Sequence, residues 1–363
     1  MLDEGELRKG SDFPLQNSNV LTSPLYAVWE INRLCNAECI HCYTGSGPNV
    51  IEKDLLTEKE AIRVARELGD AGVFQVGLSG GEPLLRDDCC HIVAELSRSG
   101  VSVALATNGY LFDKAGGKEL KKAGLESLCI SIDSHRAEVH DRIRNRPGLF
   151  DKAVNAIEAA LSENIAVVAG FSVLKYNWRE IREYVEFMKS LGIRDVNLTS
   201  YVAVGRGSLE HDLSREEERE FLYMVNRLSE EYAGSMAVMW HDCRFALINE
   251  KYSFYRFKGC GAANTTCRIA ANGDVMPCST LPIPGGNLKK RSFKEIWQNS
   301  EFFSKIRDRN NIKDDSNCGQ CVHKEDCGGC RSIAYAYYND PFAGNYHCWL
   351  DDVEPENLFK GND

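Results

Sequence analysis

Two hydrophobic patterns alternate along the chain between Tyr26 and about Ala233. Short runs rich in β-branched and aromatic residues are typical of strands, and longer stretches with an apolar residue every three or four positions are typical of amphipathic helices. Six strand–helix units in succession favour an α/β fold with a parallel sheet. The expected strands cover residues 26–31, 73–78, 101–107, 127–132, 166–174 and 195–200, and the expected helices cover 57–70, 87–99, 116–123, 150–163, 178–190 and 214–232.

From about Met239 the periodicity fades and cysteines become frequent, which indicates a second domain held more by metal than by a large core. The longest apolar run, residues 165–174, is too short to cross a bilayer and is typical of a buried strand. We therefore expect an N-terminal extension (1–24), an α/β domain (25–236), a cysteine-rich domain (237–350) and an acidic tail (351–363).

The composition limits the partners and the compartment. Of the 363 residues, 43% are hydrophobic and 26% are charged, as in globular proteins. The net charge of −10 argues against a nucleic-acid partner, because such a surface needs a basic face. Fifteen cysteines follow an N-terminus that lacks the apolar segment of a secretion signal. Such cysteines are expected to bind metal in a reducing compartment, so we expect a cytoplasmic protein that works at low oxygen.

Cys35, Cys39 and Cys42 form a C-x3-C-x2-C run directly after the first predicted strand. Three thiolates can hold a cubane [4Fe–4S] cluster and leave its fourth iron open to a small molecule. A zinc knuckle or three unrelated core cysteines are the alternatives, although zinc is usually bound through paired C-x2-C halves. The third cysteine is preceded by His41, whose ring suits a flat heterocycle, and the turn Ser79-Gly-Gly-Glu-Pro83 follows later in the chain.

This combination resembles the radical S-adenosylmethionine (SAM) superfamily. The resemblance implies a partial (β/α)6 barrel, similar to part of a TIM barrel, with its chemistry at the C-terminal ends of the strands. It also implies that SAM binds the open iron and is reductively split to a 5′-deoxyadenosyl radical, which abstracts a hydrogen from the substrate. A capping or turn role is the alternative for each residue implied to contact SAM. These residues are His41, Gly80, Gly81, Glu82, Pro83, Asn108, Ser131, Asp133, Arg144, Leu198 and Tyr201.

The C-terminal cysteines have a spacing of their own, which is densest between residues 318 and 330. It resembles the SPASM domain, an extension of radical SAM enzymes that carries two auxiliary [4Fe–4S] clusters, so three clusters are implied in all. That family usually has three residues between the last clustered pair, where this chain has only Gly328 and Gly329. Two structural zinc sites are the alternative, because they also use eight thiolates. The resemblance assigns Cys260, Cys267, Cys278 and Cys330 to the first auxiliary cluster, and Cys318, Cys321, Cys327 and Cys348 to the second.

The segment 260–348 looks most like a branch that includes the alternative-haem-pathway enzymes. That likeness favours an iron porphyrin as the substrate, with removal of its carboxylate side chains. A porphyrin is flat and anionic at its rim, so we expect Tyr252–Lys258, with Arg256, to contact it and His241 to bind its iron. The alternatives are an amphipathic element that packs on the barrel for this segment, and a core or surface histidine for His241. The auxiliary clusters are implied to take up an electron, and a flavodoxin or ferredoxin to donate one. The alternatives are a peptide-modifying enzyme, acting in sulfatase maturation or on a ribosomal peptide, and a plain electron carrier.

Overall fold

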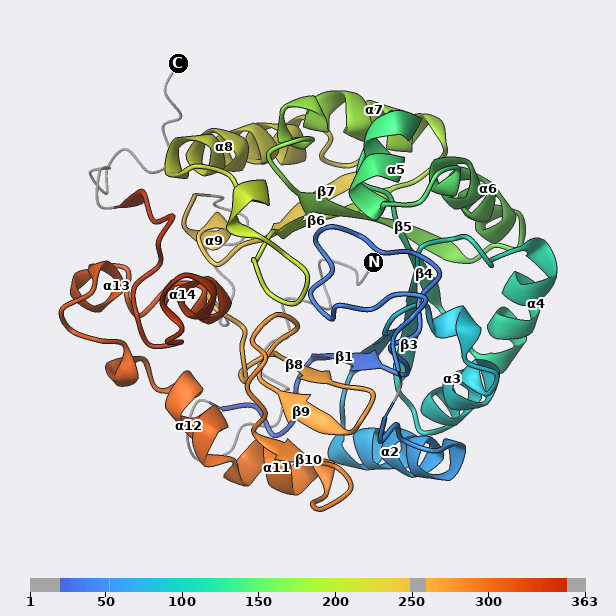
Figure 1. Ribbon diagram of the computed structural model, residues 1–363, viewed down its shortest axis with the longest axis horizontal. Helices are drawn as coiled ribbons and strands as arrows, with labels where there is room; N and C mark the ends of the chain where they lie inside the picture. Colours follow the sequence, from blue (N-terminus) through green and yellow to red (C-terminus); the bar gives the residue numbers. More distant parts are fainter. Residues whose placement is uncertain (1–19, 52, 249–258, 351–363) are drawn as a thin grey trace.

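The strands form one continuous, curved sheet. The computed structural model describes residues 20–51, 53–248 and 259–350, and within these ranges ten strands follow the order β10-β9-β8-β1-β2-β3-β4-β5-β6-β7. From β1 to β7 all neighbours run parallel, and the sheet does not close on itself (Figure 1). The strands are β1 (Tyr26–Glu30), β2 (Gln75–Ser79), β3 (Ser102–Thr107), β4 (Ser127–Ser131), β5 (Ala166–Val173), β6 (Asp195–Ser200), β7 (Ala237–His241), β8 (Thr266–Ile269), β9 (Asp274–Met276) and β10 (Gly286–Asn287).

Helices cover the outer side of the parallel strands, and the C-terminal helices continue the ring beside them (Figure 1). The six predicted strands and six predicted helices are confirmed, and the α/β partial barrel with them. The helix α5, the strand β7 and the elements after residue 241 were not predicted. The helices are α2 (Glu58–Ala71), α3 (Cys89–Arg98), α4 (Lys114–Ala123), α5 (Ala137–Arg144), α6 (Leu149–Ser162), α7 (Ile181–Ser190), α8 (Arg215–Glu231), α9 (Phe245–Ile248), α11 (Phe293–Asn299), α12 (Glu301–Arg307), α13 (Asn317–Gln320) and α14 (Arg331–Tyr338).

Local sequence explains where the barrel helices begin and end. Thr57 and Glu60 form a capping box at the start of α2, in which each side chain accepts a hydrogen bond from the other residue's backbone amide. Gly72 ends the same helix with a φ of 78°, a left-handed conformation that glycine adopts without strain. Ser214 and Glu217 repeat the capping box at α8.

Side-chain alternation along the strands separates the helix-covered core from the inside of the barrel. In β1, Ala27 and Trp29 belong to the large core cluster. In β6, Leu198 belongs to the same core, whereas its neighbour Thr199 is exposed. Because successive side chains of a strand point to opposite faces, Thr199 lies on the inner face of the curved sheet.

The cysteine-rich part adds its strands to the same sheet. β8 pairs in parallel with β1, in register from Tyr26 with Thr266 to Trp29 with Ile269, and β9 and β10 follow in antiparallel pairs. Residues on both sides of the expected boundary at 236/237 therefore share this sheet, since β7 also extends it. No helix in the described part of the chain is long and apolar enough to cross a membrane.

Candidate active site

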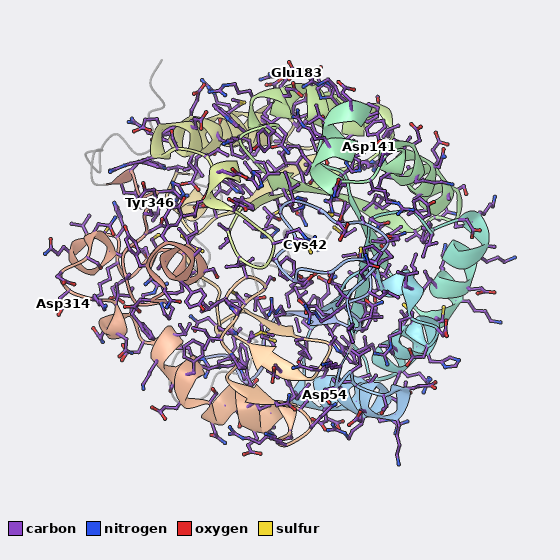
Figure 2. All side chains as sticks on the ribbon, viewed as in Figure 1. Cys42, Asp54, Asp141, Glu183, Asp314 and Tyr346 are labelled. Carbon is purple, nitrogen blue, oxygen red and sulfur yellow. The ribbon has the colours of Figure 1, made fainter. Side chains whose placement is uncertain are left out.

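The triad loop, which we define as residues 31–47, crosses the centre of the ring of strands, where Cys42 lies (Figure 2). Cys35 and Cys39 are buried and Cys42 is half-buried, and the three form part of one apolar cluster. Backbone hydrogen bonds hold the loop, with Cys35 N donating to Gly47 O at 3.2 Å and Cys42 N donating to Cys39 O at 3.2 Å. The structure thus brings the three predicted thiols together at the C-terminal end of β1.

Two side-chain nitrogens point at the triad sulfurs. Asn108 Nδ2 lies 3.9 Å from Cys35 Sγ, and Arg144 Nη1 lies 3.8 Å from Cys39 Sγ. Burial raises the pKa of Cys35 to about 12, and it raises the pKa of Cys39 above its usual value against the opposing charge of Arg144. Buried thiols with directed donors fit thiolate ligands of a cluster, because the cluster supplies the positive charge that makes ionisation favourable.

The Gly-Gly-Glu-Pro turn packs directly against the triad loop. Gly80 has a φ of 144°, and a Cβ atom at Gly81 would lie only 2.0 Å from Leu34 O, so both positions require glycine. Gly81 N donates to Asn32 O at 3.0 Å, and Glu82 N donates to Leu34 O at 2.8 Å. The turn and the triad loop therefore fix each other's position through hydrogen bonds and close backbone packing.

The carboxylate of Glu82 is fully buried behind this turn. It accepts hydrogen bonds from Thr107 Oγ1 at 2.8 Å, Asn108 N at 2.9 Å and Leu84 N at 3.2 Å. Burial raises its pKa to about 7, although the three hydrogen bonds favour the ionised form. Glu82 thus joins the end of β2 to the end of β3, and Pro83, also predicted to border SAM, opens a short 3-10 helix next to it.

Asp133 and Arg144 form a buried ion pair, with Nε 2.6 Å from Oδ2. Asp133 Oδ1 also accepts from Ser172 N at 2.9 Å, and His41 Nε2 lies 3.9 Å from Oδ2. Burial opposes ionisation of Asp133, but the charge of Arg144 more than offsets it and the pKa falls below its usual value. Burial lowers the pKa of His41 to about 4, so its ring is neutral at pH 7. These three predicted residues therefore meet beside the triad.

The remaining predicted SAM contacts lie on or after β4 and β6. Ser131 is half-buried at the C-terminal end of β4, and Tyr201 is mostly buried just after β6. Leu198 is a correction, because its side chain lies in the core on the helix-covered face, in register with Trp240 of β7. The residue of β6 that reaches the inner face near this end is Thr199.

His241, predicted to bind the substrate iron, ends β7 in register with Thr199. Its side chain is exposed on the inner face, since Trp240 points the other way and packs on Phe221 with ring centroids 4.8 Å apart. The predicted segment Tyr252–Lys258, with Arg256, lies outside the described residues.

Three of the four cysteines predicted for the first auxiliary cluster meet at the start of α14. Cys260 and Cys278 both oppose ionisation of Cys330, which places the three thiols within electrostatic reach of one another. Cys278 Sγ lies 3.1 Å from Ser332 Oγ. The fourth, Cys267, has no exposed surface and belongs to β8, and the structure does not bring it to the other three.

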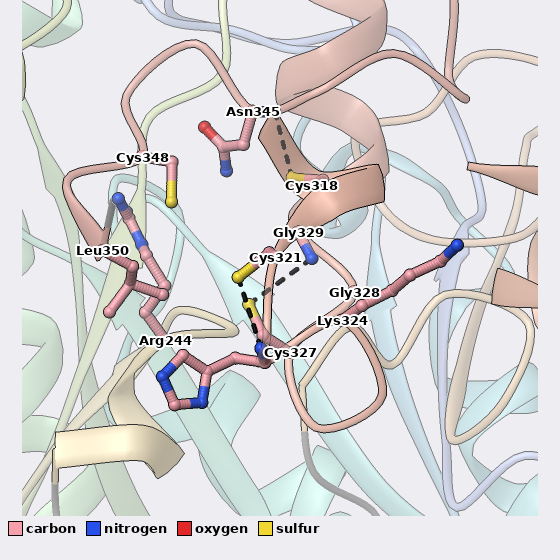
Figure 3. Close-up of a pocket in the computed structure, with 11 residues that line it drawn as sticks. Arg244, Cys318, Cys321, Lys324, Cys327, Gly328, Gly329, Asn345, Cys348 and Leu350 are labelled. Atoms are coloured by element: carbon pink, nitrogen blue, oxygen red, sulfur yellow. Dashed lines mark hydrogen bonds between the residues drawn. The ribbon is translucent and has the colours of Figure 1, made fainter. Parts of the chain in front are cut away.

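The second predicted group lines one small hollow (Figure 3). Backbone N–H groups donate to three of its sulfurs, at 3.2 Å for Cys318, 3.3 Å for Cys321 and 3.4 Å for Cys327. Arg244 and Lys324 also line the hollow. Among the described residues, no three His, Cys, Asp or Glu side chains lie close enough together to hold a single metal ion. The four cysteines in the hollow are Cys318, Cys321, Cys327 and Cys348.

Two family models and several curated relatives match the chain. The radical SAM superfamily model matches residues 29–188, and the SPASM model, an iron–sulfur cluster-binding domain, matches residues 260–322. The chain is 31% identical over 339 residues to a Methanosarcina barkeri protein named AdoMet-dependent heme synthase, covering 90% of this chain and 96% of that protein. The chain belongs to the radical SAM superfamily. Its two matched domains imply that this radical SAM enzyme binds iron–sulfur clusters and SAM.

Other relatives agree with this assignment. A second M. barkeri protein, named Fe-coproporphyrin III synthase, is 27% identical over 356 residues, or 90% of this chain and 88% of that protein. SuiB of Streptococcus suis, solved with SAM, has a TM-score of 0.74 at 19% identity and covers 95% of this chain and 80% of that one. The SAM-bound structure of anSMEcpe has a TM-score of 0.72 at 18% identity, with 93% and 96% covered. The two structures show that the radical SAM fold is shared.

Sequence reasoning missed Arg206, which holds the radical SAM triad loop in place. Its Nη1 donates to Cys39 O at 3.0 Å, its Nη2 donates to Ser46 O at 2.6 Å, and its backbone N donates to Cys42 O at 2.9 Å. The preceding Gly205 has a φ of 65° and lets the two loops come close. A Gly-Arg-Gly turn just after a strand was the available signal.

Proposed function

We propose that this radical SAM enzyme acts in haem biosynthesis, where it removes propionate carboxylates from an iron porphyrin. The names of the two M. barkeri relatives support a porphyrin substrate. Decarboxylation balances when one hydrogen atom leaves the propionate side chain, the bond to the carboxylate breaks, carbon dioxide departs and a vinyl group forms with one electron left over. The enzyme must therefore provide a hydrogen acceptor, an electron acceptor and a site for a flat, anionic molecule.

The observation that carries this proposal is a pair of tyrosines, each flanked by two cations. They follow the C-terminal ends of two barrel strands, and we call this end of the barrel its mouth. Tyr110 follows β3, with the Arg146 guanidinium 4.1 Å and the Lys152 ammonium 5.5 Å from its ring centroid. Tyr176 follows β5, with Arg142 at 5.4 Å and Lys175 at 5.5 Å. Aromatic faces with neighbouring cations suit a flat apolar ring that carries carboxylates at its rim.

Both tyrosines lie beside the triad loop. Tyr110 packs against the apolar cluster that contains Cys35 and Cys39, and Tyr176 packs in a cluster with Ile40. A porphyrin held between them would present its side chains close to the triad, where the hydrogen atom must be removed. The exposed imidazole of His241 on the inner face of β7 is suited to bind the porphyrin iron.

The cofactors we propose are SAM and three [4Fe–4S] clusters, one at the triad and two in the C-terminal part. When bound, they supply the 5′-deoxyadenosyl radical and a route for electrons. Asn108 and Arg144 would support the thiolates of the triad, and His41 would lie along the adenine. We further propose that Asp133 and Arg144 contact the ribose and carboxylate of SAM, while Arg206 keeps the loop in position.

The proposed electron donor is a flavodoxin or ferredoxin of low potential. Free thiols at all fifteen cysteine positions are consistent with a reducing compartment, and we propose the cytoplasm. Tyr43 follows Cys42 and shares an apolar cluster with Cys330, so it connects the triad loop with the C-terminal part.

The test is an anaerobic titration of the reconstituted enzyme with iron coproporphyrin III, monitored by the Soret band. We expect stoichiometric binding, 5′-deoxyadenosine release and product porphyrins with fewer carboxylates. Lys152→Ala should weaken binding about tenfold, because a charge-assisted contact to a carboxylate is lost. Lys189→Ala is the matched control, since Lys189 lies over the ring of Tyr232 next to α7 and should leave binding unchanged.

Variants of the triad separate binding from chemistry. Cys35→Ala, Cys39→Ala or Cys42→Ala should each abolish 5′-deoxyadenosine release while the porphyrin still binds. Unchanged Soret spectra with every haem precursor, together with turnover of a cysteine- or serine-containing peptide, would overturn the porphyrin assignment in favour of a peptide substrate.

A further inference from the structure

The first auxiliary group contains three convergent thiols, although the family resemblance predicted four. The missing one is Cys267, in the centre of the four-residue strand β8. Its neighbour Arg268 points to one face, where it lies 3.5 Å from Glu30 and with its guanidinium 5.6 Å from the Tyr43 ring centroid. Because side chains alternate along a strand, Cys267 must point to the opposite face.

The surroundings of Cys267 are those of a core residue. It shares its face with Ile269 and is in register with Ala27 of β1, and none of the three has exposed surface. The charge that acts on its thiol comes from Arg307 of α12, which donates to Ala263 O and Trp297 O. The thiol is therefore directed at the layer of outer helices.

The other three thiols lie on the opposite side of β8 and share one environment. The β8–β9 pairing sets Arg268 against Met276, and Arg268 Nη1 donates to Ser279 O at 2.6 Å, next to Cys278. The Cys260 thiol accepts from Arg331 N, at the start of α14. Backbone N–H groups of the first turn of α14 thus reach the sulfurs of Cys260 and Cys330.

This group also borders the mouth of the barrel. Cys330 packs in one apolar cluster with Tyr43 of the triad loop and with Val202 and Val204, which follow β6. Cys330 therefore lies on the side of β8 that faces the triad loop.

We propose that the first auxiliary cluster is held by Cys260, Cys278 and Cys330 alone, and that its fourth iron takes an exchangeable oxygen ligand. Three thiolates around a cubane leave one iron for an external ligand, as at the triad. This proposal requires only that the C-terminal part binds a cluster, so it stands or falls independently of the porphyrin.

Iron content tests the ligand set. Anaerobically reconstituted Cys267→Ala and Cys267→Val should keep the wild-type iron and sulfide content, with Cys267→Val preserving the side-chain volume in the core. Cys330→Ala should lose up to about four irons per chain. Cys129→Ala serves as a control for the removal of a thiol assigned to no cluster. Loss of about four irons in Cys267→Val with an unchanged circular dichroism spectrum would overturn the proposal.

Electron paramagnetic resonance tests the open iron. In a Cys35→Ala/Cys39→Ala/Cys42→Ala variant the triad iron is absent, so any remaining ligand-sensitive signal must come from an auxiliary cluster. Adding cyanide to the dithionite-reduced variant should shift the g values of one cluster, and Cys330→Ala in the same background should remove the shift. Spectra that are identical with and without cyanide would show a fourth ligand from the protein and overturn the proposal.

Discussion

Glu82 connects the ends of β2 and β3 at the mouth of the barrel. Its carboxylate is fully buried, yet it holds the ends of two strands together through three hydrogen bonds. Placing a carboxylate there costs free energy when it ionises, because the surroundings cannot replace the water it loses. This cost determines whether the stability of the folded protein rises or falls with pH.

We predict that Glu82 makes the protein less stable as the pH rises from 4.5 to 7. Its pKa is about 7 in the folded chain against the usual 4.5, so the folded state binds more protons in this window and loses stability as they leave. The full effect is about 3 kcal/mol. Urea midpoints measured across this range should fall more steeply for the wild type than for Glu82→Gln. Parallel pH profiles for the two proteins would show that Glu82 does not titrate there.

The sequence alone was enough to predict those site residues that directly follow a strand. The triad, the Gly-Gly-Glu-Pro turn and the Asp133–Arg144 pair each follow a strand end, and parallel strands gather those ends at one mouth. Leu198 and Cys267 lie within strands, where a shift of one residue moves a side chain to the other face. Spacing along the chain does not carry that information, whereas strand register does.

Among the elements, those with a full hydrophobic period were predicted within a few residues. β7 was missed because it follows α8 closely and begins the stretch where cysteines interrupt the pattern. The sequence also did not predict the ion pairs of Arg244, which stabilise this region. Arg244, which is 1% exposed, lies 2.9 Å from Glu218 of α8 and 2.7 Å from Asp242, and it donates to His347 O at 3.1 Å.

We predict that Arg244→Ala destabilises the protein by about 3–5 kcal/mol, because two carboxylates would remain buried without a counter-charge. The urea midpoint of the reconstituted protein is the measurement. The control is Arg182→Ala, which removes an ion pair to Glu231 that is equally short, at 2.8 Å, but exposed to solvent, and should leave the midpoint close to wild type. Equal shifts of the urea midpoint in the two variants would contradict the prediction, because burial of the Arg244 ion pairs would then add nothing to the stability.

At the scale of the whole molecule, two cysteine-rich regions far apart in sequence belong to one ring of elements. The triad lies at the centre of the ring, and the hollow with Cys318 and Cys348 lies among the C-terminal helices at one side of it (Figures 1 and 3). An electron left on the substrate can leave through such a series of sites, provided that each lies within tunnelling reach of the next.

We predict that Cys348→Ala separates the two halves of the reaction. Deoxyadenosine formation should stay at least partly intact, because the triad is untouched, whereas product should fall by about tenfold or more, because the substrate electron has no outlet. Both are measured by liquid chromatography of one anaerobic reaction, with Cys90→Ala as a control at an unassigned, half-buried cysteine. Equal loss of deoxyadenosine and of product would instead indicate that the second auxiliary cluster mainly stabilises the fold.

The pairing of β8 with β1 has a consequence for how such an enzyme can change over evolution. Four residues of β1, from Tyr26 to Trp29, have their partners in the C-terminal part, so the first strand of the catalytic barrel becomes an edge once that part is removed. A bare edge strand invites pairing between copies and aggregation. The C-terminal part is therefore not an interchangeable cassette, and any replacement has to bring a strand of its own to protect β1.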